Sequence, residues 1–225
     1  MAKPIYNITP FTLLDYPDKT ACILWFAGCN MRCLYCYNPD IVEGKGRYSY
    51  EDAITFIRKR KYLLDGVVLS GGECTLHKQL PAFCRQLKDE GMLIKIDTNG
   101  TNPDLILDLQ TDGLVDYIAL DYKAPAAKHA SITQSSLYAR FESFLKILLK
   151  SNIPFEIRTT VHTDLLNEED LQEMIAFLEK EGFAGKLFIQ HFVNDSRTIG
   201  QLRNIAGKID PGKFASGGIE MVFRN

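Results

Sequence analysis

Hydrophobic positions in this chain fall into short blocks that alternate with longer segments of mixed polarity. Six apolar, β-rich runs each end in polar, Cys, Gly or charged residues, which is the pattern of buried strands. These predicted strands cover residues 21–26, 66–69, 93–97, 117–121, 155–161 and 187–192. Helix-like segments lie between them, at residues 50–64, 79–90, 103–110, 137–150 and 168–181. The chain therefore alternates strand and helix over most of its length.

Short polar side chains mark the starts of two predicted helices. Ser49 with Asp52 and Asn167 with Asp170 have oxygens that can accept the free amides of a first helical turn. Strands and helices that alternate in this way predict an α/β fold with a parallel sheet and right-handed crossovers. An open doubly wound sheet and a full or partial barrel fit the periodicity equally well.

Nothing in the sequence divides the chain. Its 225 residues contain no internal repeat, low-complexity tract or Gly/Ser linker. We therefore expect a single domain over residues 1–225, with residues 200–225 as a C-terminal extension of uncertain form. A domain of this length can bury a full core without covalent staples.

The predicted topology indicates where a site would lie, because functional residues of parallel α/β sheets gather at the carboxyl ends of the strands. The candidates at those ends are the segment from Cys29 to Cys36, Gly71, Gly72, Glu73, Asp97, Thr98, Asn99, Asp121, Lys123, Arg158 and His191. All six predicted strands would thus contribute to one site.

Composition narrows the classes of function and the compartment. With 46% hydrophobic residues, 24% charged residues and a formal net charge of −2, the chain is typical of a globular protein without a general attraction for nucleic acid. The longest apolar stretch, residues 21–27, is far shorter than the roughly 20 residues that span a bilayer. Because the N-terminus also lacks a basic start followed by an apolar core, we expect a cytoplasmic protein with no membrane partner.

Three of the six cysteines lie within eight positions, in residues 28–36, Gly-Cys-Asn-Met-Arg-Cys-Leu-Tyr-Cys. Thiols so close together, in a chain too large to need disulfides, indicate a metal. Three thiolates on one loop would leave one iron of a [4Fe–4S] cluster open to a small molecule. A structural zinc site completed by His77 or Cys74 is a second interpretation, but it leaves Gly71-Gly72-Glu73 unexplained. A third, an electron-transfer ferredoxin, would need four cysteines per cluster.

The cysteine segment resembles the signature of the radical S-adenosylmethionine superfamily, a Cys-x3-Cys-x-aromatic-Cys loop followed by a Gly-Gly-Glu segment. Tyr35 fills the aromatic position. The resemblance implies that Cys29, Cys33 and Cys36 hold a [4Fe–4S] cluster whose fourth iron binds the amino and carboxylate groups of S-adenosylmethionine. One electron then cleaves the sulfonium and gives a 5′-deoxyadenosyl radical.

Gly71-Gly72-Glu73 matches the family segment that receives the methionine amino group. Two residues without side chains let backbone approach a ligand, and a carboxylate can pair with an ammonium. Most relatives carry Pro at the next position, where this chain has Cys74. Cys74 is either a chance substitution or a redox-active neighbour.

Segments around the cysteines resemble a narrower family. Residues 11–20, Phe-Thr-Leu-Leu-Asp-Tyr-Pro-Asp-Lys-Thr, and residues 37–40, Tyr-Asn-Pro-Asp, are similar to the anaerobic ribonucleoside-triphosphate reductase activating protein family. That resemblance implies a single-domain, partial (β/α)6 TIM-like barrel with parallel strands and an open lateral mouth. The radical would take a hydrogen from a glycine Cα of a partner protein, and reduced flavodoxin or ferredoxin would donate the electron.

The same resemblance assigns further cofactor contacts to two strand ends. Asp97-Thr98 and Asp121 with Lys123 would help to hold the cofactor carboxylate, partly through a monovalent cation. Two carboxylates near an anionic ligand need a cation or Lys123 to offset their charge. Helix caps or surface charges are the other interpretation of the two aspartates.

Two further side chains at strand ends carry weaker signals. His191 matches a histidine near the adenosyl group in pyruvate formate-lyase activases, although a histidine at a strand end is often a core residue. Arg158 would be a buried cation and would need an anionic partner, either a site carboxylate or the cofactor. Cys22 and Cys84 lie among apolar residues and are predicted to be buried, inert thiols.

The resulting hypothesis is a radical activase of anaerobic ribonucleotide reductase, with three alternatives. The first is an activase of pyruvate formate-lyase or another glycyl-radical enzyme. The second is a small-molecule radical enzyme such as a deazaguanine-forming synthase, although that type has a different lead-in to its cysteines. The third is a non-catalytic iron–sulfur or zinc binding module.

Overall fold

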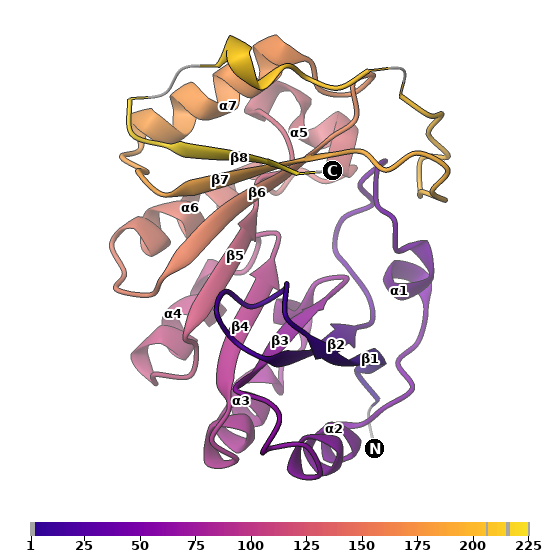
Figure 1. The fold of residues 1–225 in the computed structure, drawn as a ribbon, viewed down its shortest axis with the longest axis vertical. Helices are drawn as coiled ribbons and strands as arrows, with labels where there is room; N and C mark the ends of the chain where they lie inside the picture. Colours follow the sequence, from indigo (N-terminus) through magenta and orange to yellow (C-terminus); the bar gives the residue numbers. More distant parts are fainter. Residues whose placement is uncertain (1–2, 206, 215–216, 225) are drawn as a thin grey trace. The chain divides into compact units, whose positions relative to one another are not determined.

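The structure is a computed structural model that describes residues 3–205, 207–214 and 217–224. Its strands and helices alternate as the sequence predicts, and the mostly parallel α/β fold is confirmed (Figure 1). The chain divides into two compact units with interleaved segments. The first comprises residues 1–30, 38–98 and 102–119, and the second residues 31–37, 99–101 and 120–225. The single domain expected from the sequence stays a prediction.

The first unit contains four complete strands and the start of a fifth. They are β1 (Ile5–Thr12), β2 (Ala21–Phe26), β3 (Gly66–Gly71), β4 (Leu93–Thr98) and β5 (Tyr117–Asp121). Its helices are α1 (Pro39–Glu43), α2 (Tyr50–Arg58), the 3-10 helix η1 (Cys74–Leu76), α3 (Leu80–Asp89) and α4 (Pro103–Thr111). β2, β3 and β4 pair in parallel, whereas β1 pairs antiparallel with β2. β2 is buried along nearly its whole length, which explains its continuous apolar sequence.

The second unit contains the remaining elements. They are α5 (Ala126–Thr133), α6 (Tyr138–Leu149), β6 (Phe155–Val161), α7 (Glu168–Lys180), β7 (Lys186–His191), the 3-10 helix η2 (Pro211–Lys213) and β8 (Glu220–Arg224). β6, β7 and β8 pair in parallel, and α7 runs alongside β7 and β8 (Figure 1). In both units, neighbouring strands follow the order of the chain.

Both predicted helix caps are confirmed. Ser49 and Asp52 form a capping box at the start of α2, and Asn167 and Asp170 form one at the start of α7. The predicted end of α2 at residue 64 is wrong, because the helix stops at Arg58 and turns follow. Tyr62 and Leu63 are 93% and 62% exposed, so these turns have no apolar face to bury.

The predicted C-terminal extension has defined structure in its described part. η2 and β8 lie there, and β8 pairs with β7 from Lys186 with Glu220 to Gln190 with Arg224. Residues 206, 215–216 and 225 of the predicted extension lie outside the described residues.

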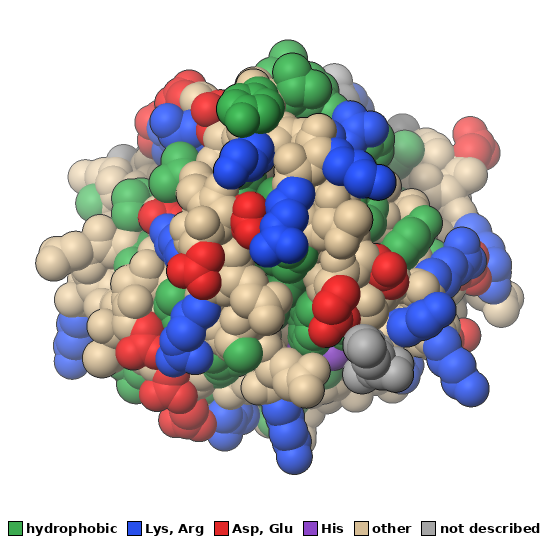
Figure 2. Space-filling view, turned by 90° about the horizontal axis from the view of Figure 1, so that it is seen from below, with side chains coloured by type: hydrophobic (Ala, Val, Ile, Leu, Met, Phe, Trp, Pro, Cys, Tyr) green, Lys and Arg blue, Asp and Glu red, His purple; other side chains and the backbone are tan. Residues whose placement is uncertain are grey.

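The protein surface is of mixed character on the face shown in Figure 2. Acidic and basic side chains are interspersed there, and hydrophobic side chains reach the surface in places. No helix of the described residues is long and apolar enough to cross a membrane.

Candidate functional site

The Gly-Gly-Glu segment is held against the start of the cysteine loop in the first unit. The amide of Gly72 donates to the Phe26 carbonyl at 2.9 Å, and the amide of Glu73 donates to the Gly28 carbonyl at 2.9 Å. A Cβ on Gly71 would overlap the backbone of Phe26, and one on Gly72 would overlap the Gly28 carbonyl. Gly71 also has a φ of +120°, which L side chains rarely adopt. In the structure, the two glycines allow β2 and β3 to approach each other where the cysteine loop begins.

Glu73 is a buried carboxylate whose orientation is fixed by neighbouring hydroxyls. The residue is only 1% exposed. Its Oε1 accepts hydrogen bonds from the Thr75 hydroxyl at 2.6 Å, the Thr75 amide at 3.2 Å and the Thr98 hydroxyl at 2.9 Å. The structure therefore brings Glu73 and Thr98 together, as predicted for two residues of one site.

Asp97 is paired with a buried lysine that the sequence analysis did not select. Lys95 Nζ lies 2.6 Å from Asp97 Oδ1, and the Ser70 hydroxyl donates to Asp97 Oδ2 at 3.1 Å. The lysine side chain is 1% exposed and the aspartate side chain 10%. Asp97 is therefore neither a cap nor a surface charge. The pair could have been found from the sequence, because Lys95 lies two positions before Asp97 and positions i and i+2 of a strand share a face.

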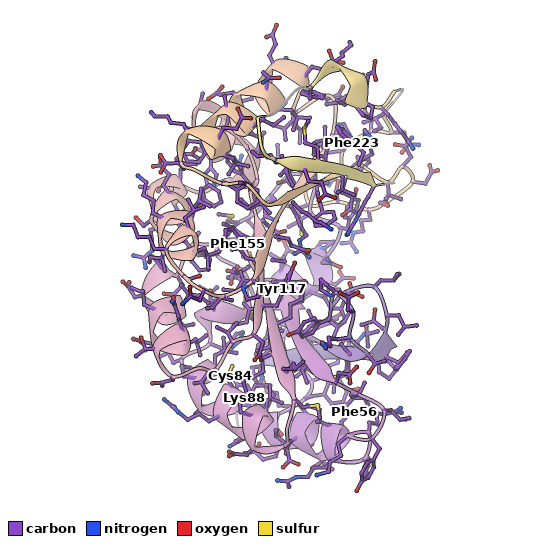
Figure 3. All side chains as sticks on the ribbon, turned by 60° about the vertical axis from the view of Figure 1, so that its left-hand side comes forward. Phe56, Cys84, Lys88, Tyr117, Phe155 and Phe223 are labelled. Atoms are coloured by element: carbon purple, nitrogen blue, oxygen red, sulfur yellow. The ribbon has the colours of Figure 1, made fainter. Side chains whose placement is uncertain are left out.

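Cys74 lies in the core, which favours a chance substitution over a redox-active neighbour. It is fully buried, and its Sγ donates to the carbonyls of Leu69 at 3.5 Å and Asp97 at 3.7 Å. Burial, and then the charge of Glu73, raises the pKa of this thiol. Cys22 and Cys84 are also buried, and burial raises the pKa of each to about 12. Cys84 lies on α3, as does Lys88 one turn later (Figure 3).

In the second unit, backbone hydrogen bonds hold the cysteine loop in place. The amides of Arg32 and Leu34 donate to the carbonyls of Thr133 and Ile132 at 2.8 and 2.9 Å. The Cys36 amide donates to the Cys33 carbonyl at 3.0 Å, so these two cysteines share one tight turn. The Cys33 residue is 8% exposed and Cys36 is partly exposed.

Tyr35, the aromatic residue of the predicted motif, anchors this turn to the end of β5. Its hydroxyl donates to the Lys123 carbonyl at 3.1 Å, and the residue is 4% exposed. Burial raises the pKa of Tyr35 far more than the charge of Lys123 lowers it, so the phenol stays protonated and can donate.

Asp121, Lys123 and Arg158 form a charged group in which each cation contacts the carboxylate. Lys123 Nζ lies 3.0 Å from Asp121 Oδ2, and Arg158 Nε lies 2.9 Å from Asp121 Oδ1. Burial raises the pKa of Asp121, but the charges of Arg158 and Lys123 outweigh it and hold the pKa at about 2. The anionic partner expected for Arg158 is thus Asp121.

Both carboxylates that were expected to need a cation or Lys123 beside them have a cation of the protein within hydrogen-bond distance. Lys95 is paired with Asp97, and Arg158 and Lys123 are paired with Asp121. The monovalent cation stays a prediction.

His191 does not join the Arg158 group. In the parallel pair of β6 and β7, Arg158 is in register with Phe188, and Val161 is in register with His191. Residues three apart in a strand point to opposite faces, so His191 lies on the face opposite to Arg158. His191 is buried, and its Nδ1 has no hydrogen-bond partner in the described structure. Its ring centroid lies 6.0 Å from that of Phe223 on β8. Figure 3 labels Phe223 on this strand.

Neither residue proposed to complete a zinc site has a metal-ligand arrangement. His77 Nε2 lies 3.1 Å from the Ala27 carbonyl oxygen, and burial lowers the pKa of its imidazole. Cys74 is buried against carbonyls, as described above. In the described part of the chain, no three or more His, Cys, Asp or Glu side chains are grouped as they would be around a metal ion.

Comparison with known protein families decides the class of this protein. The model of the Radical SAM superfamily matches residues 23–180, which include all three clustered cysteines, the Gly-Gly-Glu segment, Asp97, Asp121 and Arg158. The chain belongs to the radical SAM superfamily. It is therefore an enzyme, and a [4Fe–4S] cluster and S-adenosylmethionine are the cofactors of its family. A non-catalytic module is thereby removed from the alternatives.

Two relatives of this radical SAM enzyme are named as activating enzymes. The chain is 32% identical over 182 residues to MJ1227 of Methanocaldococcus jannaschii, whose name assigns it to the glycyl-radical enzyme activating enzymes. That match covers 77% of this chain and 75% of the relative. The chain is also 30% identical to the pyruvate formate-lyase 1-activating enzyme of Escherichia coli K12, in a match that covers 66% of this chain. This second match spans 63% of the E. coli enzyme.

The fold is similar to that of solved radical SAM enzymes. Streptococcus suis SuiB bound to S-adenosylmethionine matches with a TM-score of 0.68 at 12% identity, over 90% of this chain. The chain spans about half of the SuiB chain, 52%. At that identity the likeness concerns the fold.

Proposed function

We propose that this protein installs a glycyl radical on anaerobic ribonucleotide reductase. The observation that carries the proposal is the superfamily match over residues 23–180, together with relatives named as glycyl-radical enzyme activating enzymes. The lead-in at residues 11–20 resembles the activating proteins of the reductase and supports that partner.

Cys29, Cys33 and Cys36 are the proposed cluster ligands. All three carry a thiol on one short segment, and thiolates are the ligands that iron–sulfur clusters use. Three ligands for four irons leave one iron for the cofactor. A bound and reduced cluster would supply one electron for the reductive cleavage of S-adenosylmethionine, and the resulting carbon radical would take a hydrogen atom from the glycine Cα of the partner.

The first-unit residues have proposed roles in binding the methionine part of the cofactor. Glu73 is buried and oriented by Thr75 and Thr98, so it can meet the ammonium group without losing side-chain entropy. Asp97 and Lys95 form a neutral pair beside Thr98 in the sequence, which avoids an uncompensated charge near the cofactor carboxylate.

The second-unit residues have proposed roles in positioning. Tyr35 fixes the turn of Cys33 and Cys36 through the Lys123 carbonyl. Asp121 holds Lys123 and Arg158, two cations that can face an anionic group of the cofactor. His191 has no such support, because it lies on the opposite face of its strand pair.

A protein partner is supported by exposed apolar side chains in the lead-in. Phe11, Leu13 and Leu14 are 48%, 65% and 89% exposed. Hydrogen bonds from the Leu14 amide to the Thr12 hydroxyl and from that hydroxyl to Asp15 hold this turn in shape. Ordered apolar residues facing water are typical of surfaces that contact another protein. We further propose reduced flavodoxin or ferredoxin as electron donor.

Pyruvate formate-lyase is the second candidate partner, favoured by the 30% identity to its E. coli activating enzyme. The test presents both partners to the same activase. The reconstituted, reduced protein is mixed anaerobically with S-adenosylmethionine and either purified reductase or purified pyruvate formate-lyase, and the glycyl radical is measured by electron paramagnetic resonance. The control for each partner is its variant with the radical glycine replaced by alanine.

We expect a radical on the reductase and none on its alanine variant. A radical on pyruvate formate-lyase alone would transfer the assignment to that partner. If 5′-deoxyadenosine forms but neither partner gains a radical, the protein is a radical SAM enzyme of another substrate class.

A further inference from the structure

The chain segment after β7 contacts the cysteine turn directly. We define residues 192–200 as the arm; they follow β7 and belong to the same unit as residues 31–37. The amide of Gly200 donates to the Leu34 carbonyl at 2.8 Å, and the amide of Ile199 donates to the Cys36 carbonyl at 3.2 Å. The arm therefore satisfies backbone groups of the turn that presents Cys33 and Cys36.

Tyr37, the residue after the last clustered cysteine, joins the turn to the other end of the arm. Its hydroxyl accepts a hydrogen bond from the Val193 amide at 2.8 Å. Its ring stacks on Phe192, with centroids 5.3 Å apart and an interplanar angle of 26°. Both ends of the arm are thus attached to residues 34–37.

A glycine is required where the arm approaches the turn most closely. A Cβ on Gly200 would lie 2.8 Å from the Leu34 carbonyl oxygen and 2.8 Å from the Leu34 Cβ, closer than real Cβ atoms come. Any side chain at this position would push the arm away and weaken the hydrogen bond from Gly200 to Leu34.

The arm is itself held in place by side chains outside the cysteine loop. Asn194 and Asp195 exchange four hydrogen bonds of 2.8–3.1 Å with Asn204 and Ile205, which closes the loop that carries the arm. The fully buried His162 packs its ring edge on Phe192, and its Nε2 lies 2.8 Å from the Arg203 carbonyl. The arm is therefore a fastened structure that can hold the turn.

We infer that the arm is a positioning element for the cluster ligands, with Tyr37 and Gly200 as its positioning residues. Arg32 and Leu34 donate to α5 on one side of the turn, and Leu34 and Cys36 accept from the arm on the other. With both sides bonded, the turn presents Cys33 and Cys36 in one arrangement and lowers the rate at which a bound cluster loses iron. This inference rests on the proposed role of the cysteines, since it assigns the cluster to them.

The test compares Gly200→Ala and Tyr37→Phe with two matched controls. Gly207→Ala places a Cβ more than 4 Å from the other residues that the structure describes, and Tyr62→Phe removes the hydroxyl of a residue that is 93% exposed. Two quantities are measured: the rate of iron release from the reconstituted protein to a chelator, and amide hydrogen exchange over residues 32–37 in the cluster-free protein. The hydrogen-exchange measurement needs no cluster. Tyr37→Phe is the milder substitution and keeps the test possible if Gly200→Ala fails to fold.

We expect both arm variants to exchange residues 32–37 faster than the controls and to release iron about tenfold faster, as for other contacts that orient metal ligands. Iron release and exchange at the control rates, in a wild type that holds its cluster, would overturn the inference. A wild type that binds no cluster would overturn the proposed function instead, and the role of the arm toward a cluster would fall with it. The exchange data would still show whether the arm holds the turn.

Discussion

At the residue scale, Asp121 is the carboxylate that offsets the charges of two cations in the second unit. It contacts both Arg158 and Lys123, and all three side chains are about three-quarters buried. Removing the carboxylate alone would leave two cations side by side in a partly buried place. Two such cations would lower the free energy of unfolding, because an uncompensated buried charge loses its hydration without gaining a counter-charge.

We therefore expect Asp121→Asn to lower the free energy of unfolding by about 2 kcal/mol. The matched control is Asp164→Asn, which removes the partner of Arg203 in a pair that is 40% and 81% exposed. Exposed pairs contribute little, so this variant should change the free energy of unfolding much less than Asp121→Asn does. Urea unfolding at pH 7 measures both, and equal effects of the two substitutions would contradict the role given to Asp121.

The same group gives the protein an acid-dependent stability. Folding lowers the pKa of Asp121 to about 2, whereas an unfolded aspartate has a pKa of about 3.9. The unfolded state therefore binds this proton more readily, and the stabilisation is complete above about pH 4 and lost as the pH falls toward 2. In urea unfolding between pH 5 and pH 2.5, wild type should lose more stability than Asp121→Asn. Parallel losses would show that Asp121 contributes nothing.

Five of the six thiols should fall into two classes by reactivity. Cys22, Cys74 and Cys84 are buried, and burial raises the pKa of each, so few thiolates exist at pH 8. Cys29 and Cys36 are partly exposed. Treating the native, cluster-free protein with iodoacetamide should label Cys29 and Cys36, and unfolding in guanidinium should expose all six. Peptide mass spectrometry reads the sites, and labelling of Cys74 in the native state would contradict its place in the core.

At the scale of single elements, η1 shows why a cysteine is tolerated where most relatives have proline. Cys74 is the first residue of this 3-10 helix, a position that suits proline. Glu73 before it has φ −145° and ψ 102°, the extended conformation that a residue before proline prefers. The local backbone is thus already compatible with the more common residue.

We accordingly expect Cys74→Pro to fold and to retain cleavage of S-adenosylmethionine within about threefold of wild type. The lost contacts of the thiol with the Leu69 and Asp97 carbonyls should cost about 1 kcal/mol. The assay is 5′-deoxyadenosine formation together with thermal unfolding. Loss of cleavage in a folded, cluster-loaded Cys74→Pro would show that the thiol has a chemical role.

Strands were predictable from the sequence where they are buried on both faces. β2, β3 and β5 contain continuous apolar runs that are buried. β4, β6 and β7 mix charged or polar residues with apolar ones but keep most of their apolar residues buried. β1 and β8 escaped prediction since their burial is broken: only Ile5 is buried in β1, and no residue of β8 is. A half-exposed strand at a sheet edge carries polar residues that resemble those of a loop.

The candidate site could be predicted as a set of residues but not as a set of contacts. The cysteine spacing and the Gly-Gly-Glu segment were recognisable from the sequence alone, because their chemistry depends on residue type. The pairing of Arg158 with Asp121 depends on strand register, which no local pattern specifies. The arm was invisible for the same reason, since its hydrogen bonds join residues more than 150 positions apart in the chain.

At the scale of the whole molecule, the chain has one proposed task. Its superfamily match, its relatives and its three clustered cysteines all favour radical chemistry on S-adenosylmethionine, and the partner decides what that radical does. The claim that the three cysteines hold the catalytic cluster is central, because the roles of Glu73, Tyr35 and the arm all depend on it.

The most direct test of that claim is formation of 5′-deoxyadenosine by the protein reconstituted anaerobically with iron and sulfide, then reduced with dithionite in the presence of S-adenosylmethionine. Cys33→Ala removes a proposed ligand, and Cys84→Ala is the matched control, because it removes a buried thiol outside the cysteine loop. We predict product from wild type and Cys84→Ala and none from Cys33→Ala. Product from Cys33→Ala at the wild-type rate, or none from a wild type that holds an intact cluster, would contradict the account.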